Sequence, residues 1–476
     1  MKSLAKNSLF NALYQMLNMI FPLITSMYVA RTLLPEGVGR VAYAQNIASY
    51  FVTAAALGIP TVGLRAVSIE RNNKLKLNKV FSELVILNAC STLISLLLYL
   101  SLVFGNPAIK VDYPLYLAVG LVIAFNLINI DWFYQAHEEY VYIVIRSIVV
   151  KVLSLLGLFV FVTSKEDYVI YAVLTSFATC GNYIFNIVRV KRYVTFSFRD
   201  LNLLQHIKPV MFFAGTLFFA AIYGKVDTTM LGIIVGDESV GYYSYAHKIL
   251  QIGVSFCASI TSAFLPRLSY CYEHDKEQFY ALIAKGLHII AFLSIPAATG
   301  LFILAPEAIV LLFGAAFMPA AQTLRIFSGL IIVYAFGNLM CYQMMICSGS
   351  EKKHVVVLAC AAVMNVILNL VLIPRFKHNG AAIASVVTEA FINIVESIYF
   401  AKLLKLKYNW TVMREALISS GIMGLSILFL KNIVHGSVFA FGCCIIIGVV
   451  VYVTVNIIFK NKLVTEGIIL MRRKFL

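Results

Sequence analysis

The chain has 476 residues, of which 61% are hydrophobic and only 13% are charged, with a mean hydropathy of +0.88 and a formal net charge of +16. Soluble domains carry about 25% charged residues, so this composition excludes an ordinary soluble enzyme and predicts an all-α, polytopic membrane protein surrounded by membrane lipid. The basic residues are scattered over short loops and not gathered on one domain, so no nucleic-acid partner is predicted.

Apolar runs long enough to cross a bilayer recur along the whole sequence. A helix needs about 20 apolar residues to span a hydrocarbon layer of about 30 Å. We count about fourteen such runs, at 9–30, 41–64, 80–104, 114–136, 143–163, 168–189, 209–235, 241–265, 286–304, 320–347, 355–374, 381–401, 415–431 and 439–459. The eleventh and twelfth touch through a short turn at Pro374–Gly380. The first run is too long for a signal-peptide core and lacks a small-residue cleavage pattern, so we interpret it as a span.

The connections between the runs predict orientation and argue against catalysis. If the N-terminus lies inside, the cytoplasmic loops hold most of the 38 Lys and Arg residues, which predicts cytoplasmic N- and C-termini. Attraction to anionic lipid of the inner leaflet explains the loop charges by itself. No connection is much longer than about 20 residues, so a soluble catalytic domain has no room and the chain is predicted not to be an enzyme.

Two short segments, 35–47 and 237–249, look like copies of each other. PEGVGRVAYAQNI and DESVGYYSYAHKI share Glu, Val, Gly, Tyr, Ala and Ile at matching positions. Each follows a long apolar run and opens another, and an even number of spans separates them, so both halves should enter the membrane in the same direction. Parallel repeats of this kind are typical of transporters with a substrate site between the halves. We predict an N-terminal six-helix lobe (1–208), a C-terminal six-helix lobe (209–402), and two additional spans with a basic tail (403–476).

Several basic side chains fall inside these spans: Arg146, Lys151, Lys225, Lys248 and Arg325. A charge at mid-helix costs about 2.5–3.5 kcal/mol, so it usually faces a watery cavity or a partner. For Lys225 two interpretations stay open, an anion-binding cation and an ion pair between helices. Snorkelling to the interface fits Arg146 and Lys248, fits Lys151 less well, and is hard to apply to Lys225.

Acidic side chains also lie at membrane depth. Asp227 follows Lys225 by two residues, roughly 200° around the helix, so the two cannot pair on one face. Glu389, Asn393 and Glu396 share one face of the twelfth span. Glu389, near mid-depth, is a candidate for coupling transport to an H⁺ or Na⁺ gradient or to the membrane potential. The alternative is an ion pair with a Lys or Arg on a neighbouring helix.

Amides and aromatic residues complete the polar pattern. Asn126 with Asn129, and Asn365 with Asn369, form stripes that either join helices or line a substrate path. The nine Cys residues include no CxxC pair, and no metal cluster or cofactor motif is present, so no cofactor or metal is predicted.

The end of the fourth span reads NIDWFYQAHEEY (129–140). Trp132, Phe133 and Tyr134 have the composition of an interfacial aromatic belt. Asp131 and Gln135 are four residues apart, so they share a face at the inner end of the span. The physical pattern allows either an anchor or a gate.

Motifs along the chain stand in a characteristic order: RTLLPEGVG at 31–39, GIPTVGLR at 58–65, DWFYQAHEEY at 131–140 with Arg146, Asp227 with LG at 231–232, GYYSYAHK at 241–248, and NVILNLVLIP at 365–374 with GAA at 380–382. Together they resemble the signatures of bacterial polysaccharide flippases, the O-antigen and capsule-repeat exporters of the multidrug/oligosaccharidyl-lipid/polysaccharide superfamily. The resemblance covers roughly residues 1–400. His378-Asn379 before Gly380, and the apolar pair after Lys248, depart from the pattern.

The resemblance implies two six-helix lobes in a V plus two extra C-terminal helices in a bacterial cytoplasmic membrane. It implies alternating access and a polyprenyl-pyrophosphate-linked oligosaccharide as cargo, with polysaccharide polymerase machinery as a further partner. A cationic, hydrated central cavity would replace the water around the pyrophosphate. The candidate cations are Lys225, Arg325, Arg146, Lys151 and Lys248, with Arg31 and Arg65 at the mouths. The candidates for coupling or ion pairs are Asp227, Glu389, Asp131 and Glu396. The candidate polar lining is Asn126, Asn129, Gln135, Asn365, Asn369 and Asn393.

Three other classes compete with this interpretation. A drug antiporter of the same superfamily would favour an acidic cavity for cationic drugs, against the excess of cations in the spans. A membrane polymerase or ligase that acts on lipid-linked sugars would be expected to have a long outer loop with catalytic residues. A scaffold without transport activity would not explain charges at mid-depth.

Overall fold

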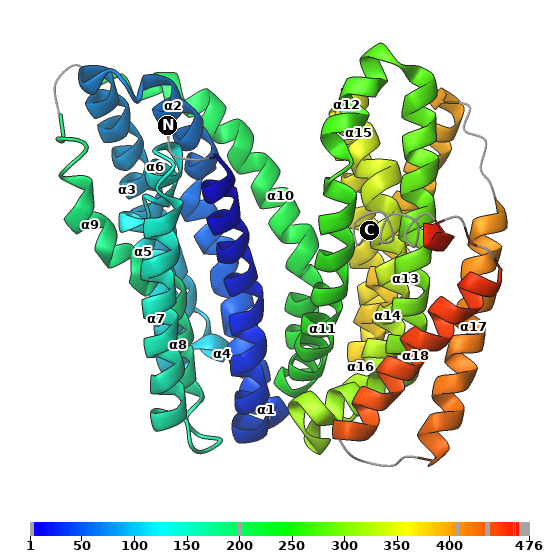
Figure 1. Cartoon of the computed structure of the whole chain (residues 1–476). Helices are drawn as coiled ribbons and strands as arrows, with labels where there is room; N and C mark the ends of the chain where they lie inside the picture. The colour runs from blue at the N-terminus through cyan, green and yellow to red at the C-terminus, as the bar shows by residue number, and fades with distance from the viewer. Residues whose placement is uncertain are drawn as a thin grey trace. The chain divides into compact units, whose positions relative to one another are not determined.

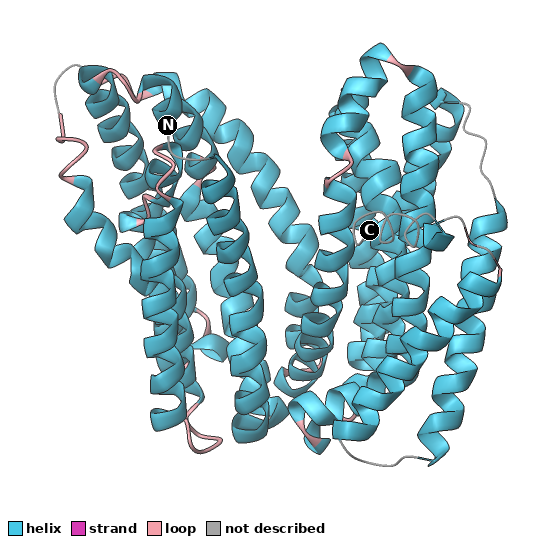
Figure 2. Cartoon of the chain, in the orientation of Figure 1, coloured by secondary structure: helices cyan, strands magenta, loops and turns pink. Residues whose placement is uncertain are grey.

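The computed structural model describes residues 4–197, 201–404, 410–433, 438–459, 461 and 463–465, and these residues form helices joined by short loops, with no strand among them (Figure 2). The predicted all-α fold is confirmed. Contacts divide the chain into two compact units, Met1–Gly232 and Ile233–Leu476. The predicted lobe boundary at 208/209 falls near the start of the helix that ends the first unit, and this boundary stays a prediction.

The first unit contains α1 (Leu4–Ala56), α2 (Ile59–Glu70), α3 (Lys74–Gly105), α4 (Pro107–Lys110), α5 (Tyr113–Phe125), η1 (Asn126–Ile128), α6 (Asp131–Ala136), α7 (Tyr140–Phe161), α8 (Tyr168–Cys180), η2 (Gly181–Tyr183), α9 (Ile184–Val190) and nearly all of α10 (Leu204–Ile234). The second unit contains α11 (Asp237–Ser262), α12 (Leu265–His274), α13 (Lys276–Phe313), η3 (Ala315–Phe317), α14 (Ala320–Gly337), the π-helix η4 (Asn338–Gln343), α15 (Met344–Ser348), α16 (Glu351–Leu404), α17 (Trp410–Ile433) and α18 (Val438–Ile458). Figure 1 labels most of these helices and colours them in chain order.

Helix α1 consists of two antiparallel arms that meet at Leu34, whose φ of 59° is left-handed and which precedes Pro35. The first arm runs in the same direction as α7, and the second runs in the same direction as α8. Because α7 and α8 form a hairpin, the two arms must run in opposite directions. The contacts that fix these directions are Asn18–Lys151, Tyr28–Val162, Arg40–Tyr168 and Gln45–Thr175.

Helix α16 reverses in the same way at Lys377, whose φ is 51°, shortly after Pro374. Gly380 is required at this turn, because a Cβ there would collide with the Leu372 carbonyl. His354 near the start of α16 contacts Glu396 near its end. The short turn that the sequence predicts between Pro374 and Gly380 is therefore present.

The two reversals bear on the number of membrane crossings. Within the described residues, eleven segments are long and apolar enough to cross a membrane. Two of them, Ile20–Glu70 and Lys352–Phe400, each contain one of the reversals, and Tyr113–Ile128 is a shorter apolar helix. The expected total of about fourteen spans stays a prediction that is compatible with this arrangement.

The two repeat segments occupy matching structural positions in their own units. Each opens a helical arm directly after a residue with positive φ, Leu34 in one unit and Gly236 (φ 109°) in the other. In both segments a glutamate contacts the side chain one turn later. These contacts are Glu36–Arg40 and Glu238–Tyr242. Equivalent residues of the two segments are also buried, namely Val38 with Val240 and Ala44 with Ala246. Local geometry thus supports a repeated building block.

The expected aromatic belt at Trp132, Phe133 and Tyr134 is wrong. Their side chains are 2%, 0% and 0% exposed, and they pack in the core of the first unit. The 3₁₀ segment η1 separates α6 from α5, and α6 packs against α2, where a Cβ on Gly63 would collide with the Trp132 ring. These aromatic rings hold short helices together and do not anchor the protein at a lipid interface.

Candidate functional site

A buried charge cluster joins three helices of the first unit. Asp131, the first residue of α6, binds the Arg146 guanidinium of α7. Asn186 of α9 completes the cluster, since its Oδ1 accepts from Arg146 and its Nδ2 donates to Asp131 Oδ1 at 3.1 Å. Arg146 is only 4% exposed, and its guanidinium carbon lies 5.1 Å from the centroid of the Tyr142 ring.

This cluster changes the interpretation of the motif formed by Asp131 and Arg146. The predicted head-group cation and the predicted coupling carboxylate bind each other, so much of the charge of each is already balanced. Asn186, which the sequence reasoning missed, is an amide in an apolar run, and that was the available signal. The arrangement favours a structural role for this pair, while a contact with substrate stays a prediction.

Lys151 and Lys225 are cations of the first unit without a carboxylate partner among the described residues. Lys151 is 8% exposed, and its amine binds the Asn18 side-chain oxygen of α1. Lys225 is half-buried on α10, and no hydrogen bond or ion pair reaches its amine from the described part of the chain. Its backbone carbonyl accepts from Asn46 Nδ2 at 3.3 Å, so the helix is fixed while the amine stays available.

The second unit holds two cations of the same kind. Lys248 on α11 places its amine 4.2 Å from the centroid of the Tyr245 ring. The guanidinium carbon of Arg325 on α14 lies 5.8 Å from the centroid of the Phe302 ring. The buried Nε of Arg325 lacks a hydrogen-bond partner in the described residues. An aromatic face stabilises a cation without supplying a counter-charge, so neither ring contact provides an anion for these groups.

The two arginines predicted at the mouths, Arg31 and Arg65, are both exposed. Arg31 lies at the end of the first arm of α1, just before the reversal, whereas Arg65 lies on α2. The second arm of α1 separates them by about 33 Å of helix at 1.5 Å per residue. They are thus not brought together, as expected for two ends of one span.

The predicted carboxylates differ in their surroundings. Glu396, only 4% exposed, binds His354 through one oxygen, while its Oε2 is buried without a hydrogen bond in the described residues. His354 was missed, because its partner is 42 positions away. Asp227 is buried on α10, and Glu389 is half-buried on the second arm of α16.

The predicted amides mostly bind protein groups. Asn126 donates to Asn88 and Thr92 of α3, at 3.0 and 2.8 Å, and Asn393 donates to the Val333 carbonyl at 3.0 Å. Two amides bind another amide of their own segment, in the pairs Asn129–Asn126 and Asn369–Asn365. Gln135 is half-buried on α6. The cross-helix bonds favour the packing interpretation of Asn126 and Asn393.

Comparisons with known proteins agree with the motif pattern. The family model for "Polysaccharide biosynthesis protein" matches residues 4–271, and the model named MatE matches residues 213–371. A putative O-antigen transporter of Escherichia coli (strain K12) is 23% identical over 394 residues, covering 82% of this chain and 95% of the relative. The capsular polysaccharide biosynthesis protein CapF of Staphylococcus aureus is 25% identical over 416 residues, covering 84% and 99%.

Solved structures show which fold the chain adopts. The inward closed conformation of the lipid II flippase MurJ superposes with a TM-score of 0.76 at 17% identity, covering 96% of this chain and 99% of that chain. An inward-facing multidrug resistance transporter of the MATE family and MOP superfamily gives a TM-score of 0.64 at 16% identity, covering 81% and 94%. The chain therefore has the polytopic fold that these transporters share.

Proposed function

Because the chain belongs to the polysaccharide biosynthesis protein family, we propose that it is a flippase that moves a lipid-linked oligosaccharide from the inner to the outer leaflet by alternating access. The proposed cargo carries its sugars on a polyprenyl pyrophosphate. Relatives described as an O-antigen transporter and as a probable low-salt glycan biosynthesis flippase support this assignment. The proposed location is a bacterial cytoplasmic membrane, with both termini in the cytoplasm and polymerase machinery as a partner.

One observation carries the proposal: four basic side chains at membrane depth lack a carboxylate partner among the described residues. They are Lys151, Lys225, Lys248 and Arg325. A pyrophosphate loses its hydration when it enters hydrocarbon, and cations held without their own anion can replace that hydration. A chain that needed charges only for packing would be expected to pair them, as Asp131 and Arg146 do.

The residues divide into roles on this basis. We assign contact with the pyrophosphate to Lys225 and the other three unpaired cations. Asp131 with Arg146 fixes the α6–α7 corner. Asp227, Glu389 and Glu396 stay the candidates for coupling to an H⁺ or Na⁺ gradient, and Glu396 is the strongest of them because one of its buried oxygens lacks a partner among the described residues.

Complementation tests the proposal. The full chain is expressed in a bacterial strain that lacks its own flippase, and surface polysaccharide is measured by immunoblot and cell-surface labelling. Restored polysaccharide is the expected result. Unchanged lack of polysaccharide, in cells with normal levels of the protein in the membrane and of the lipid-linked precursor, would contradict the proposal.

A drug antiporter of the same superfamily is the alternative, and the MatE match supports its fold. The four unpaired cations disfavour organic cations as cargo, since like charges repel at this depth. Expression of the chain in a drug-sensitive strain separates the two functions. We expect no rise in resistance to cationic drugs, and a clear rise without restored polysaccharide would favour the antiporter.

A further inference from the structure

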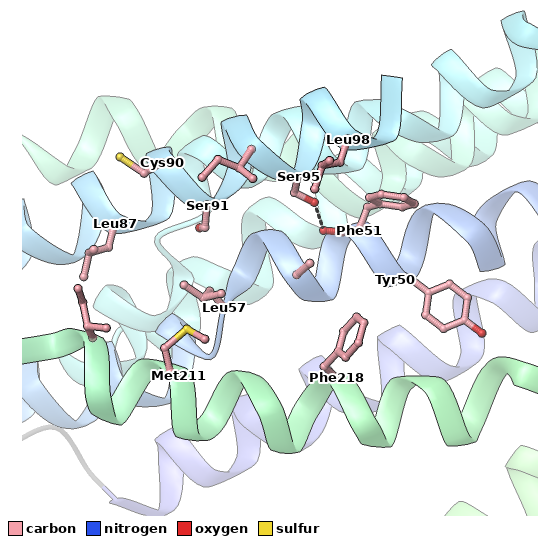
Figure 3. Close-up of a pocket in the computed structure, with 13 residues that line it drawn as sticks. Tyr50, Phe51, Leu57, Leu87, Cys90, Ser91, Ser95, Leu98, Met211 and Phe218 are labelled. Carbon is pink, nitrogen blue, oxygen red and sulfur yellow. Dashed lines mark hydrogen bonds between the residues drawn. The ribbon is translucent and has the colours of Figure 1, made fainter. Parts of the chain in front are cut away.

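The first unit contains an apolar cavity of about 560 Å³ between α1, α3 and α10. Figure 3 shows Phe51 from α1, Leu57 from the turn just after α1, Leu87 from α3, and Met211 and Phe218 from α10 around this space. The two serines on its α3 wall point their hydroxyls away from it, toward the backbone of α1. Ser91 donates to the Ala55 carbonyl and Ser95 to the Phe51 carbonyl, both at 2.6 Å. The lining is therefore mostly hydrocarbon, and its other polar groups are the Cys90 thiol and the Tyr50 hydroxyl, which contacts Thr229.

The cavity exists because α10 is bonded to its unit at two places and diverges between them. Near its start, His206 Nε2 lies 2.8 Å from the Glu83 carboxylate of α3, and Gln205 donates to the same carboxylate at 2.8 Å. Toward its other end, Thr229 Oγ1 accepts from Asn46 Nδ2 of α1 at 2.7 Å and contacts the Tyr50 hydroxyl at 2.9 Å. About 35 Å of helix separates the two attachments.

The cavity is open on the side of α3 and α10. Ile94 and Leu98 on α3 are 60% and 57% exposed, and Met211 on α10 is 55% exposed. These helices have the length and apolarity of membrane spans, so the surrounding medium at this level is hydrocarbon. An empty apolar space of this size forfeits dispersion contacts along its whole lining, so a hydrocarbon chain should fill it.

Lys225 lies on α10 beyond the part of the helix that lines this cavity. Met211, Phe218 and Lys225 are spaced seven residues apart, so they form one stripe along α10. Tyr50 lines the cavity and also contacts Thr229, one turn beyond Lys225. The apolar stripe thus ends at an amine without a partner among the described residues. A lipid with a tail in the cavity would bring a phosphate to Lys225.

The depth of Lys225 distinguishes the two lipids that could supply such a tail. Lys225 lies about 14 Å before the end of α10, well inside an apolar span. A bilayer phospholipid keeps its phosphate in the interfacial region, so its head group does not reach this level. A lipid whose head group crosses the membrane does pass it.

We propose that this cavity binds the polyprenyl chain of the transported lipid while Lys225 holds its diphosphate. This inference rests on the proposed function and adds to it a binding site for the lipid half of the cargo. The site lies wholly within the first unit and uses α1, α3 and α10.

Photolabelling tests the site. The full chain is placed in nanodiscs of phosphatidylethanolamine and phosphatidylglycerol with geranylgeranyl diphosphate that carries a diazirine at the end of its chain. Labelled peptides are identified by mass spectrometry. We expect labels within 87–98 and 207–218, displaced by undecaprenyl diphosphate. A phosphatidylglycerol that carries the diazirine on an acyl chain should label these peptides weakly, and equal labelling by both probes would overturn the proposal.

Matched variants on adjacent residues sharpen the test. Met211→Trp fills the cavity, whereas Phe212→Trp changes a side chain that is 71% exposed and does not line it. We expect labelling to fall at least about tenfold in Met211→Trp and to stay within about twofold in Phe212→Trp. Ala54→Phe, from the opposite wall, should reproduce the loss even if Met211→Trp folds poorly. Equal labelling in all three variants would contradict the proposal.

The head-group assignment has its own measurement. In the wild type, the corresponding prenol should label about tenfold less than the diphosphate probe. In Lys225→Gln, the two probes should label equally. If the prenol also labels about tenfold less in Lys225→Gln, Lys225 does not bind the diphosphate. Export measured in parallel keeps the two proposals separate, because export without cavity labelling contradicts only the cavity site, and labelling without export contradicts only the flippase.

Discussion

Arg146 and Asp131 form a buried ion pair between α7 and α6, with side chains only 3% and 13% exposed. The pair brings two motif residues of the sequence into one contact, and Asn186 binds both of them. In a low-dielectric interior, removal of one partner leaves the other charge without compensation. Substitutions in the motif formed by Asp131 and Arg146 should therefore be tested first for their effect on stability.

Removal of one charge at this pair should destabilise the protein. We expect Asp131→Ala to lower the free energy of unfolding by about 3–5 kcal/mol, the usual cost of breaking a buried pair. The matched control is Arg71→Ala, which breaks the Arg71–Glu138 bridge, where both side chains are more than 40% exposed. The control should cost about 0–1 kcal/mol. Thermal unfolding of both purified variants in detergent measures the difference, and equal melting temperatures would show that the pair does not hold α6 and α7 together.

Lys225→Ala should behave in the opposite way. Because the Lys225 amine lacks a partner among the described residues, its removal breaks no ion pair there and relieves the cost of a half-buried charge. We expect an unchanged or higher melting temperature together with at least about a tenfold loss of surface polysaccharide at equal expression. Lys165→Ala, at a side chain that is 68% exposed in a loop, is the matched control and should export normally. Normal export by Lys225→Ala would remove its assigned role.

Gly63 and Trp132 should be coupled in stability. A Cβ on Gly63 would lie 2.5 Å from the Trp132 ring, so Gly63→Ala should cost about 1–3 kcal/mol through overpacking. Gly105→Ala, where nothing lies within 4 Å of the added carbon, is the control and should be nearly neutral. A double variant with Trp132→Leu should recover part of the loss. If Gly63→Ala is as stable as the control, the packing of α6 against α2 is not as tight as described.

Asp167 should contribute stability in a pH-dependent way. Its carboxylate accepts from the backbone N–H groups of Thr163 and Ser164 at 2.9 and 2.7 Å, and these bonds hold the pKa of Asp167 below its usual value. A lowered folded pKa means that the stabilisation is fully present above the unfolded value of about 3.9 and is lost as the pH falls through the lower folded value. Asp167→Asn should therefore melt below the wild type at pH 7, with the two curves converging in acid. A constant difference across this range would contradict the assignment.

The sequence predicts the fold class and one turn, because hydrophobic periodicity and turn residues act locally, but it misses the breaks within the predicted runs 41–64, 114–136 and 168–189. The short turn after Pro374 and the all-α class both follow from such signals. Trp132 shows the limit of such signals. Its residue type is common at a lipid interface, but η1 redirects the chain before α6, and the absence of a Cβ on Gly63 leaves room for the Trp132 ring in the core. Contacts across tens of residues decide its orientation, and a single sequence does not contain them.

The candidate site was predictable only as a set of residue types. A charge within an apolar run is visible in the sequence, so Lys225 and Arg146 were equally conspicuous. Their difference lies in the neighbours, because Arg146 meets Asp131 and Asn186 while the Lys225 amine meets neither a carboxylate nor an amide of the described chain. Whether a charge is paired depends on tertiary structure, so the sequence alone leaves both interpretations of Lys225 open.

The double attachment of α10 has a mechanical consequence. With His206 held by Glu83 and Thr229 held by Asn46, the intervening length resembles a beam supported at both ends. A molecule that enters the cavity therefore bends α10 between these two attachments and does not shift the whole helix. Because Lys225 lies close to the attachment at Thr229, this bending changes the direction of the Lys225 side chain more than its position. Occupation of the cavity and the direction of the Lys225 amine are therefore coupled.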